Sequence, residues 1–225
     1  MVTKIFQIAT FGTFRKDHVL IGLRMFPTHK LALICYDHDI TMAKLFSDRV
    51  RSSGKNIEVS LYSITRPNIM ESVFEHVGRM IALEKNRFQR ILVNVSSGDK
   101  SLSYAVLCAA YIRGIETFMI NPNCSNSLNV IPTPKSHYDR IITKTNLKIL
   151  NSIASAGGVI YGLDRLQQIS GLVKPLLSYH LHGRNNTKGL IDLGLVRIES
   201  KKYENGTIVV VRLTAMGKLF TKNRK

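Results

Sequence analysis

The chain of 225 residues is 44% hydrophobic and carries a formal net charge of +17. Its length exceeds the most common domain size of roughly 100–150 residues, so two domains are expected. The sequence contains neither the ~18 consecutive apolar residues of a membrane span nor a recognisable signal peptide, and its three cysteines form no C-x-x-C pair. These features argue against membrane proteins and disulfide-stabilised secreted proteins, and they predict a cytoplasmic protein.

The positive charge is unevenly distributed along the chain. Residues 1–135 hold 17 basic and 10 acidic residues, whereas residues 136–225 hold 15 and 5. The shorter segment therefore carries the larger excess, which is typical of a nucleic-acid-binding surface. The alternative is a generally basic surface that only improves solubility.

Short apolar strands and helical patterns alternate through residues 1–121. Helices are expected to start near Asp39, Asn68 and Ser101, and strands are predicted at Lys4–Thr10, Leu31–Tyr36, Ile57–Ile64, Arg90–Val95 and Glu116–Ile120. Repeated strand–helix–strand units imply a parallel sheet with helices on both faces. Residues 1–121 are therefore predicted to form a Rossmann-like α/β domain.

Residues 122–140 are predicted to be a linker. Pro122, Pro132 and Pro134 lie among Asn and Ser residues with little periodicity. Within this segment, Leu128–Ile131 has the composition of a short additional strand. The second domain is accordingly expected at residues 141–225.

Residues 141–225 have the element order of a winged helix-turn-helix domain. Two predicted strands, Val196–Lys201 and Thr207–Leu213, flank Asn205-Gly206, and Asn-Gly is a strong hairpin signal because a type I′ turn needs positive φ at both central residues. Three helices are expected before this hairpin and one after it, at Asn146–Ala156, Leu163–Ile169, Val173–His182 and Leu213–Lys218.

The helix Val173–His182 is the expected recognition helix, because the second helix of a helix-turn-helix enters the major groove of double-stranded DNA. Candidate DNA contacts lie on this helix, on the polar insertion after it and on the hairpin: Lys174, Ser178, Tyr179, His182, Arg184, Asn185, Lys188, Lys201, Lys202 and Arg212. Alternatively, the Tyr and His side chains only pack or face solvent. No metal site is expected, because His180 and His182 would diverge on a helix without further ligands nearby.

The candidate ligand-binding residues of the first domain are most concentrated directly after its fourth strand. A short polar turn leads directly into a helix, and its candidate ligand-binding residues are Asn94, Ser96, Ser97, Gly98, Asp99 and Lys100. Free N–H groups at the helix start, the helix dipole and the lysine favour an anion such as phosphate, and Gly98 permits positive φ or a close ligand approach. The alternative is an ordinary turn in which Asp99 or Ser97 only caps the helix.

The loop after the first strand is expected to face this turn. If the strand order is 3-2-1-4-5, strands 1 and 4 are neighbours where the winding direction changes, which is where doubly wound sheets bind ligands. The candidate residues of this loop are Thr10, Phe11, Gly12, Thr13, Phe14 and Arg15. Either phenylalanine can stack on a base; the alternative is that both belong to the core.

Two common phosphate-binding motifs are missing. A P-loop would need glycine at Val93, and Asp99 separates Gly98 from Lys100. The sequence also lacks G-x-G-x-x-G, so a dinucleotide cofactor is not expected, and the prediction is that the protein has no cofactor.

Two families resemble this chain. Leu177–Leu181, Gly189–Val196 and Leu213–Lys218 resemble winged-helix regulators of bacteria and archaea, although the insertion Gly183–Lys188 departs from their usual spacing. Val93–Lys100, followed by an Ala-rich helix, resembles the fourth-strand motif of the CARF (CRISPR-associated Rossmann fold) domain. Over essentially its whole length the chain is similar to archaeal CARF-like transcriptional regulators with a C-terminal winged helix.

The CARF resemblance has implications for ligand and assembly. It implies a homodimer whose paired CARF domains bind a cyclic oligoadenylate, a cyclic nucleotide effector, across the two-fold axis. In this chain Ser-Ser-Gly-Asp replaces the more common Thr-Gly-Gly-Thr-like form of the motif, which leaves the identity of the ligand open.

Three functions are consistent with these features. The first is a transcription regulator in which a nucleotide bound at the turns changes the placement of the winged helices. The second is a ring nuclease, in which Lys100 with Ser96 or Ser97 positions a ribose 2′-hydroxyl and stabilises the charge of scission; the turn itself contains no clear general base, and His18 is the nearest candidate for that role. The third is a constitutive DNA-binding protein with a structural Rossmann domain. We favour the first because it uses both the turn and the wing.

Overall fold

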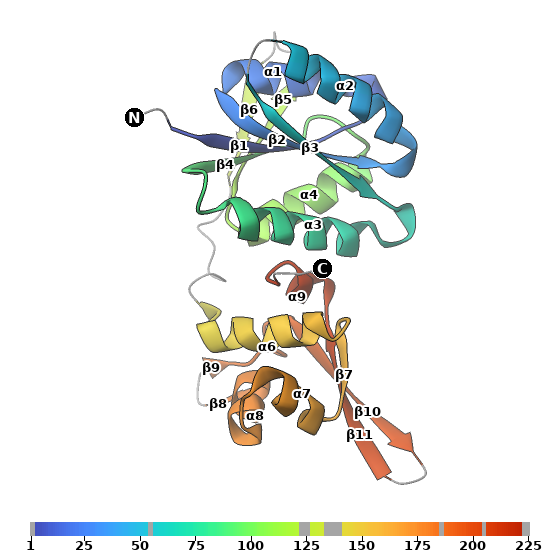
Figure 1. Cartoon of the computed structure of the whole chain (residues 1–225), viewed down its shortest axis with the longest axis vertical. Helices are drawn as coiled ribbons and strands as arrows, with labels where there is room; N and C mark the ends of the chain where they lie inside the picture. Colours follow the sequence, from blue (N-terminus) through green and yellow to red (C-terminus); the bar gives the residue numbers. More distant parts are fainter. Residues whose placement is uncertain are drawn as a thin grey trace. The chain divides into compact units, whose positions relative to one another are not determined.

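The chain forms two compact units, residues 1–139 and residues 140–225, which are drawn in Figure 1. The computed structural model describes residues 3–53, 56–121, 127–132, 141–184, 187–203 and 206–221. Among the candidate residues, Asn185 lies outside the described residues, as do the side chains of Lys201 and Lys202. The DNA contacts expected of these three residues therefore stay predictions.

The first unit is built on a six-stranded sheet in the order β3-β2-β1-β4-β5-β6. Its strands are β1 (Ile5–Thr10), β2 (Thr28–Tyr36), β3 (Glu58–Ile64), β4 (Arg90–Asn94), β5 (Glu116–Asn121) and β6 (Ser127–Ile131). The first five strands pair in parallel and β6 pairs antiparallel with β5. β1 is buried over its whole length, as expected for a strand covered on both faces. The predicted order 3-2-1-4-5 is confirmed, and so is the additional strand near residues 128–131.

Among the residues that the structure describes, four α-helices cover the two faces of this sheet: α1 (Asp17–Met25), α2 (Ile40–Ser52), α3 (Ile69–Glu84) and α4 (Lys100–Ile112). Helices α1 and α2 pack on one face, where Val19 and Phe46 join a core cluster with residues of β1 and β2. Helices α3 and α4 pack against each other on the opposite face (Figure 1). The architecture is therefore a three-layer α/β/α arrangement.

Helix α1 was not predicted from the sequence. It packs through Gly22, where a Cβ atom would lie 2.6 Å from Asn94 Nδ2 and 2.9 Å from Gln7 Nε2. Besides this glycine, only Val19 and Leu23 of the helix are buried. A nine-residue helix that contacts its sheet through glycine has too few apolar residues to produce a clear 3.6-residue pattern.

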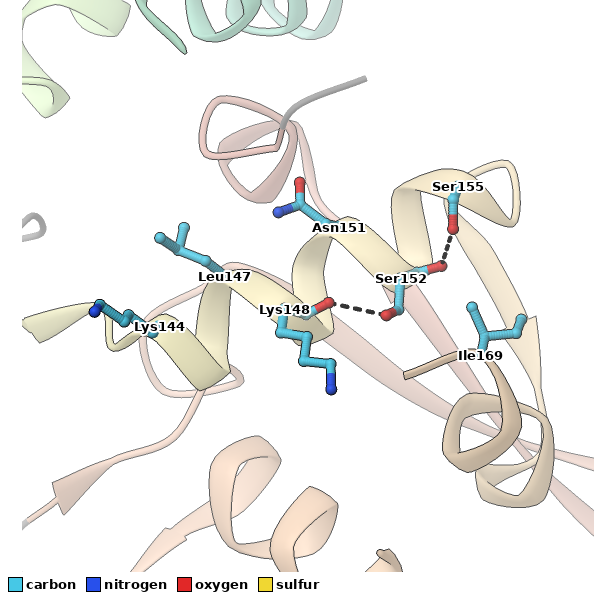
Figure 2. Close-up of a pocket in the computed structure, with 7 residues that line it drawn as sticks. All are labelled: Lys144, Leu147, Lys148, Asn151, Ser152, Ser155 and Ile169. Atoms are coloured by element: carbon cyan, nitrogen blue, oxygen red, sulfur yellow. Dashed lines mark hydrogen bonds between the residues drawn. The ribbon is translucent and has the colours of Figure 1, made fainter. Parts of the chain in front are cut away.

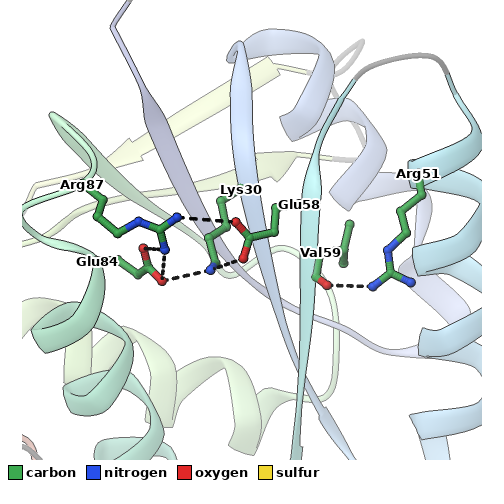
Figure 3. Close-up of polar contacts among 6 residues, drawn as sticks. All are labelled: Lys30, Arg51, Glu58, Val59, Glu84 and Arg87. Carbon is green, nitrogen blue, oxygen red and sulfur yellow. Dashed lines mark hydrogen bonds and ion pairs between the residues drawn. The ribbon is translucent and has the colours of Figure 1, made fainter.

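An ion-pair cluster with a buried lysine and a buried glutamate joins β2, β3 and the end of α3 (Figure 3). Lys30 Nζ lies 2.5 Å from Glu58 Oε1 and 2.9 Å from Glu84 Oε1, and Arg87 Nη1 lies 3.0 Å from Glu84 Oε2. The side chains of Lys30 and Glu84 are only 9% and 8% exposed. Burial lowers the pKa of Lys30, but hydrogen bonds to the two glutamates outweigh burial and raise the pKa above its ordinary value. Lys30 is therefore a charged residue held within the protein.

In its described residues, the second unit combines four helices with a three-stranded antiparallel sheet in the order β10-β11-β7. The helices are α6 (Lys144–Ser155), α7 (Leu163–Ser170), α8 (Lys174–His182) and α9 (Ala215–Lys218), and the strands are β7 (Val159–Tyr161), β10 (Val196–Tyr203) and β11 (Gly206–Leu213). The register runs from Val196–Leu213 to Tyr203–Gly206. The predicted hairpin is therefore confirmed, although Asn205 at its turn lies outside the described residues.

The core of the second unit lies between the helices and this sheet. Its fully buried side chains include Ile149, Leu150, Ile153, Leu166, Leu177, Leu181, Val210 and Val211. A separate two-stranded ladder, β8 (Gly183–Arg184) with β9 (Thr187–Lys188), follows α8 directly. Neither β7 nor this ladder was predicted, because two or three residues are too few to show the alternation that identifies a strand.

Candidate functional site

The turns after β1 and β4 meet at the carboxyl edge of the sheet. β1 and β4 are parallel neighbours, and the winding direction changes between them. The Thr10 hydroxyl donates a hydrogen bond to the carbonyl of Ser97, and the Gly12 N–H donates to Ser97 Oγ at 3.1 Å. A Cβ atom on Gly12 would lie 2.7 Å from the Cα of Gly98. The two turns that were predicted to face each other are therefore in direct backbone contact.

The polar side chains of the β4 turn point into the protein. Asn94, Ser96 and Ser97 are all buried. Asn94 Oδ1 accepts a hydrogen bond from the Ser96 N–H at 3.0 Å, and Ser96 Oγ accepts one from the Ile120 N–H at 2.7 Å. These side chains hold the turn to β5 and to the β1 loop. They shape the site instead of presenting hydroxyl or amide groups at its surface.

Asp99 connects the start of α4 with the end of β2. Its carboxylate accepts the Leu102 N–H at 2.8 Å, which caps the helix, and it accepts the Tyr36 hydroxyl at 3.0 Å. Burial and, secondly, this hydrogen bond to Asp99 raise the pKa of Tyr36 to about 12. The phenol therefore remains a proton donor at neutral pH. The capping role considered for Asp99 is confirmed, and a cross-strand contact is added to it.

Two aromatic contacts place further residues at this edge. The ring of Tyr36 stacks on His38, with centroids 5.4 Å apart and planes 14° apart, and the Arg66 guanidinium lies 5.3 Å from the Tyr36 ring centroid. Sequence reasoning missed these residues: Tyr36 ends β2, and His38 and Arg66 follow β2 and β3. The signal was available, since the carboxyl-end rule that selected the β1 and β4 loops applies to every parallel strand of the sheet.

The remaining candidates of the β1 loop separate into exposed and buried residues. Phe14 is fully exposed, and Arg15 and Lys100 are exposed as well. Thr13 is half-buried and donates a hydrogen bond to Asp39 at 2.6 Å. Phe11 is completely buried and packs on Phe46 with ring centroids 5.2 Å apart, so of its two proposed roles the core role is the one observed.

His18, in the first turn of α1, contacts the turn that follows β4. Its Nδ1 is 3.0 Å from the carbonyl oxygen of Ser96. Because a carbonyl only accepts hydrogen bonds, this contact requires a proton on Nδ1. The contact holds the imidazole beside the turn after β4.

In the second unit, α8 presents a polar face. Lys174, Ser178, Tyr179 and His182 are exposed, whereas Leu177 and Leu181 are buried. Lys174 Nζ forms an ion pair with Asp164 Oδ1 at 2.5 Å. His180 lies on the inner side, where its Nδ1 is 2.6 Å from Asn146 Oδ1 and burial lowers its pKa. Within the described part of the chain, no group of three or more His, Cys, Asp or Glu residues is arranged to hold a metal ion.

The β8–β9 ladder presents two more basic residues beside α8. Arg184 and Lys188 are exposed on its two strands. The backbones of Gly183 and Gly189 are in close contact at the base of the ladder: a Cβ atom on Gly183 would lie 2.6 Å from the Gly189 nitrogen, and one on Gly189 would lie 2.4 Å from the Gly183 nitrogen. On the longer hairpin, Arg212 lies 3.8 Å from Glu199.

A pocket of about 520 Å³ runs along α6 (Figure 2). It is lined by Lys144, Leu147, Lys148, Asn151, Ser152, Ser155 and Ile169. The hydroxyl of Ser152 donates to the Lys148 carbonyl at 2.9 Å, and that of Ser155 donates to the Ser152 carbonyl at 2.9 Å. Both serines are thus bonded to their own helix, and the charge of the pocket comes from its two lysines. This basic surface was not singled out from the sequence.

Among the residues that the structure describes, none of the helices combines the length and the hydrophobicity that crossing a lipid bilayer requires.

Comparisons with known proteins give structural matches but no sequence family. No protein-family model and no curated protein matches the chain. Csm6 from Enterococcus italicus, in a structure bound to cyclic hexa-2′-fluoro-hexa-dAMP, is 14% identical with a TM-score of 0.48, covering 69% of this chain and 48% of that one. Protein VC1899 from Vibrio cholerae is 12% identical with a TM-score of 0.49, covering 96% and 65%. Can2 from Sulfobacillus thermosulfidooxidans, in complex with cyclic tetra-adenylate, is 12% identical with a TM-score of 0.38, covering 95% and 60%. The chain spans 48% to 65% of the length of these proteins.

Proposed function

We propose that this chain is a ligand-responsive transcription regulator. Its first unit binds a nucleotide, a cyclic oligoadenylate, and its second unit is a winged helix-turn-helix domain that binds double-stranded DNA. The observation that carries the proposal is the contact of Gly12 with Gly98, which joins two glycine-containing turns at the switch point of a doubly wound sheet. The resemblance to CARF-like regulators supplies the class of ligand.

The site suits a polyanion with exposed bases. The first turn of α4 leaves backbone N–H groups for a phosphate, and the exposed Lys100 adds a positive charge beside them. Arg15 supplies a second cation from the opposite turn, and the fully exposed ring of Phe14 is available to stack on a base. The buried side chains of Asn94, Ser96 and Ser97 keep the two turns in register.

Several features of the second unit support the proposed binding to the major groove. Helix α8 follows α7 after a short turn and exposes Ser178, Tyr179 and His182 on one face. The β10–β11 hairpin occupies the place of the wing, and the β8–β9 ladder adds Arg184 and Lys188 next to the recognition helix. The two lysines of the α6 pocket are further phosphate contacts in this proposal.

Nucleotide binding is expected to change the affinity for DNA. Fluorescence anisotropy with labelled duplex DNA, with and without cyclic tetra-adenylate or cyclic hexa-adenylate, should show a change of at least about fivefold, the lower end of typical coupling between sites. Lys100→Ala should weaken nucleotide binding by about tenfold, because it removes a charge-assisted contact.

The matched control is Lys85→Ala, which removes the same charge from an exposed residue just beyond α3. It should leave nucleotide binding unchanged. Equal DNA affinity with both nucleotides and without them would count against the coupling. A missing thermal shift with each nucleotide would favour the constitutive DNA-binding protein.

Salt dependence provides a separate test of the DNA surface. Each phosphate contact contributes about one unit to the slope of log K against log salt. Arg184→Ala/Lys188→Ala should therefore reduce the magnitude of this slope by about 2 on any duplex. The control Lys44→Ala/Lys85→Ala removes two exposed charges from the first unit and should leave the slope unchanged. An unaltered slope in the first variant would remove the β8–β9 ladder from the interface.

The ring nuclease is the competing function, and the geometry of His18 favours it. In that reaction the His18 Nε2 takes the proton of a ribose 2′-hydroxyl, whose oxygen attacks the adjacent phosphate; the bond from phosphorus to the 5′-oxygen breaks, and this oxygen takes a proton from water. The product is a linear oligoadenylate with a 2′,3′-cyclic phosphate. Mass spectrometry of the nucleotide recovered from the binding experiment distinguishes the two functions, since a sensor returns the intact ring.

A further inference from the structure

A pocket lies at the amino edge of the first unit's sheet, opposite the carboxyl edge that carries the candidate functional site. Its volume is about 480 Å³, and it is formed by the end of α1, the start of β2 and the residues that lead into β3. The residues that line it are Leu23, Arg24, Pro27, Thr28, His29, Asn56 and Ile57. Parallel strands share one direction, so the six-residue strand β1 separates this pocket from the turns by about 20 Å.

Three of the lining side chains are hydrogen-bond donors. Arg24 is exposed at the end of α1, and it pairs with no carboxylate among the residues that the structure describes. His29 Nδ1 accepts the Ile5 N–H at 3.2 Å, so the proton of the imidazole is on Nε2. Asn56 is exposed two residues before β3, and its amide group adds two N–H donors. The pocket therefore combines a guanidinium with two neutral donor groups.

The pocket also has an apolar part. Leu23 and Ile57 are 6% and 7% exposed, and both belong to the core that α1 and α2 form with the sheet. The hydroxyl of Thr28 donates inward, to Gln7 Oε1 at 3.0 Å or to the Phe26 carbonyl at 3.1 Å. It therefore offers no proton to the pocket, and the donors lie beside apolar surface.

The charge around the pocket is not balanced by a carboxylate. Among the described residues that line it, none is acidic. Glu58 directly follows Ile57, but the alternation of β3 turns Glu58 to the opposite face of the sheet, where it pairs with Lys30 at 2.5 Å. A cation in the pocket would meet only the guanidinium of Arg24. An anion would instead gain charge-assisted hydrogen bonds.

We infer that this pocket binds a small organic anion, namely a carboxylate or phosphate group carried on a short apolar body. The guanidinium of Arg24 can bind two oxygens of either group at once, while the His29 Nε2–H and the Asn56 amide donate to the same group. The apolar body contacts Leu23 and Ile57. A volume of about 480 Å³ lies within the range of roughly 300–1,000 Å³ that is typical of small-molecule pockets. This site is separate from the turns after β1 and β4, whether or not those turns bind a cyclic oligoadenylate.

Phenyl phosphate and benzoate are suitable probes, because each joins an anionic group to one aromatic ring. When they are titrated into the ¹⁵N-labelled full chain, at least one should shift the amide signals around Arg24, His29 and Ile57, with a Kd below about 1 mM. The probe that binds more tightly identifies the anionic group. Benzamide lacks the charge and inorganic phosphate lacks the ring, so each should bind at least about tenfold more weakly.

Two variants test the pocket itself. Arg24→Gln keeps most of the side chain but removes its charge, and it should weaken binding of the tighter probe at least about tenfold. Asn56→Asp places a carboxylate of nearly the same size in the pocket and should weaken binding as much by repulsion. Both residues are exposed, so the fold should persist, which circular dichroism checks. The control Arg49→Gln removes the same charge from an exposed residue of α2 outside the pocket, and it should leave binding unchanged.

A chain with a net charge of +17 attracts anions at many places, so the controls decide the outcome. Equal affinity for inorganic phosphate and phenyl phosphate would mean an adventitious ion only and would overturn the inference. It is also overturned if neither probe binds, or if Arg24→Gln and Asn56→Asp both bind like the wild type. Lys100→Ala should bind the probe normally. Loss of binding in this variant, but not in Arg24→Gln, would place the probe at the turns and overturn the inference as well.

Discussion

Gly12→Ala is expected to lower the free energy of unfolding of the first unit by about 2 kcal/mol, as overpacking of a tight contact does, and to abolish nucleotide binding. The added methyl group would lie 2.7 Å from the Cα and 3.0 Å from the N of Gly98. Both atoms belong to the backbone, so no flexible side chain can move aside. The turns after β1 and β4 must then separate, and the site between them is lost.

The cause of this effect is purely steric. Gly12 has φ −150° and ψ 147°, an extended conformation that alanine adopts without strain. The control Gly157→Ala produces backbone strain without a steric clash, because Gly157 has φ +83° and a Cβ atom there would have no other atom within 4 Å. It should cost about 1 kcal/mol of backbone strain and leave nucleotide binding unchanged.

Urea unfolding followed by circular dichroism measures the first effect, and calorimetric titration with cyclic tetra-adenylate measures the second. Hydrogen exchange at residues 94–102 shows whether the loss is local to the turn. Wild-type stability and affinity in Gly12→Ala would mean that the turns are not in contact in solution.

Lys30→Met is expected to lower the free energy of unfolding by about 3 kcal/mol at pH 7, the typical cost of removing one partner of a buried ion pair. Glu84 is 8% exposed and would lose its shortest ionic contact, while Arg87, 60% exposed, remains as a weaker partner. Lys30→Met/Glu84→Leu should recover most of the loss, because it replaces the buried charges by apolar groups.

The matched control is the surface carboxylate Asp48, which pairs with Arg51 while 69% exposed. Asp48→Asn should change the free energy of unfolding by less than about 0.5 kcal/mol. If Lys30→Met changes the free energy of unfolding as little as Asp48→Asn does, the Lys30 cluster is hydrated in solution and does not hold β2, β3 and α3 together.

The pH dependence of this cluster has a definite sign. The folded pKa of Lys30 is raised above its ordinary value of 10.5, so its stabilisation is fully present below that pH and is lost as the pH rises through the folded pKa. The stability difference between the wild type and Lys30→Met should therefore shrink above pH 10.5. A difference that stays constant into this range would contradict the proton linkage.

The position of the candidate site could be predicted from the sequence, but several contacts between its side chains could not. These contacts have a common physical origin. The turn Asn94–Lys100 is continuous in the chain and follows an apolar strand, so its position was predictable. Tyr36 and Asp99 are 63 residues apart, and the hydrogen bond between their side chains exists only because β2 and β4 flank β1. Contacts of this kind depend on the packing of the whole sheet and leave no local pattern.

The sequence by itself determined the alternating strands and helices of the first unit and the hairpin of residues 196–213, and it predicted that the turns after β1 and β4 meet if the strand order is 3-2-1-4-5. Continuous apolar runs, helical periodicity and Asn-Gly are local signals, whereas the strand order is set by pairing between distant segments. Only the tertiary structure decided that Phe11 belongs to the core, that Ser96 faces Ile120 and that α1 packs through Gly22. The direction of a side chain depends on which partners lie beside it, and these partners come from strands and helices distant in the chain.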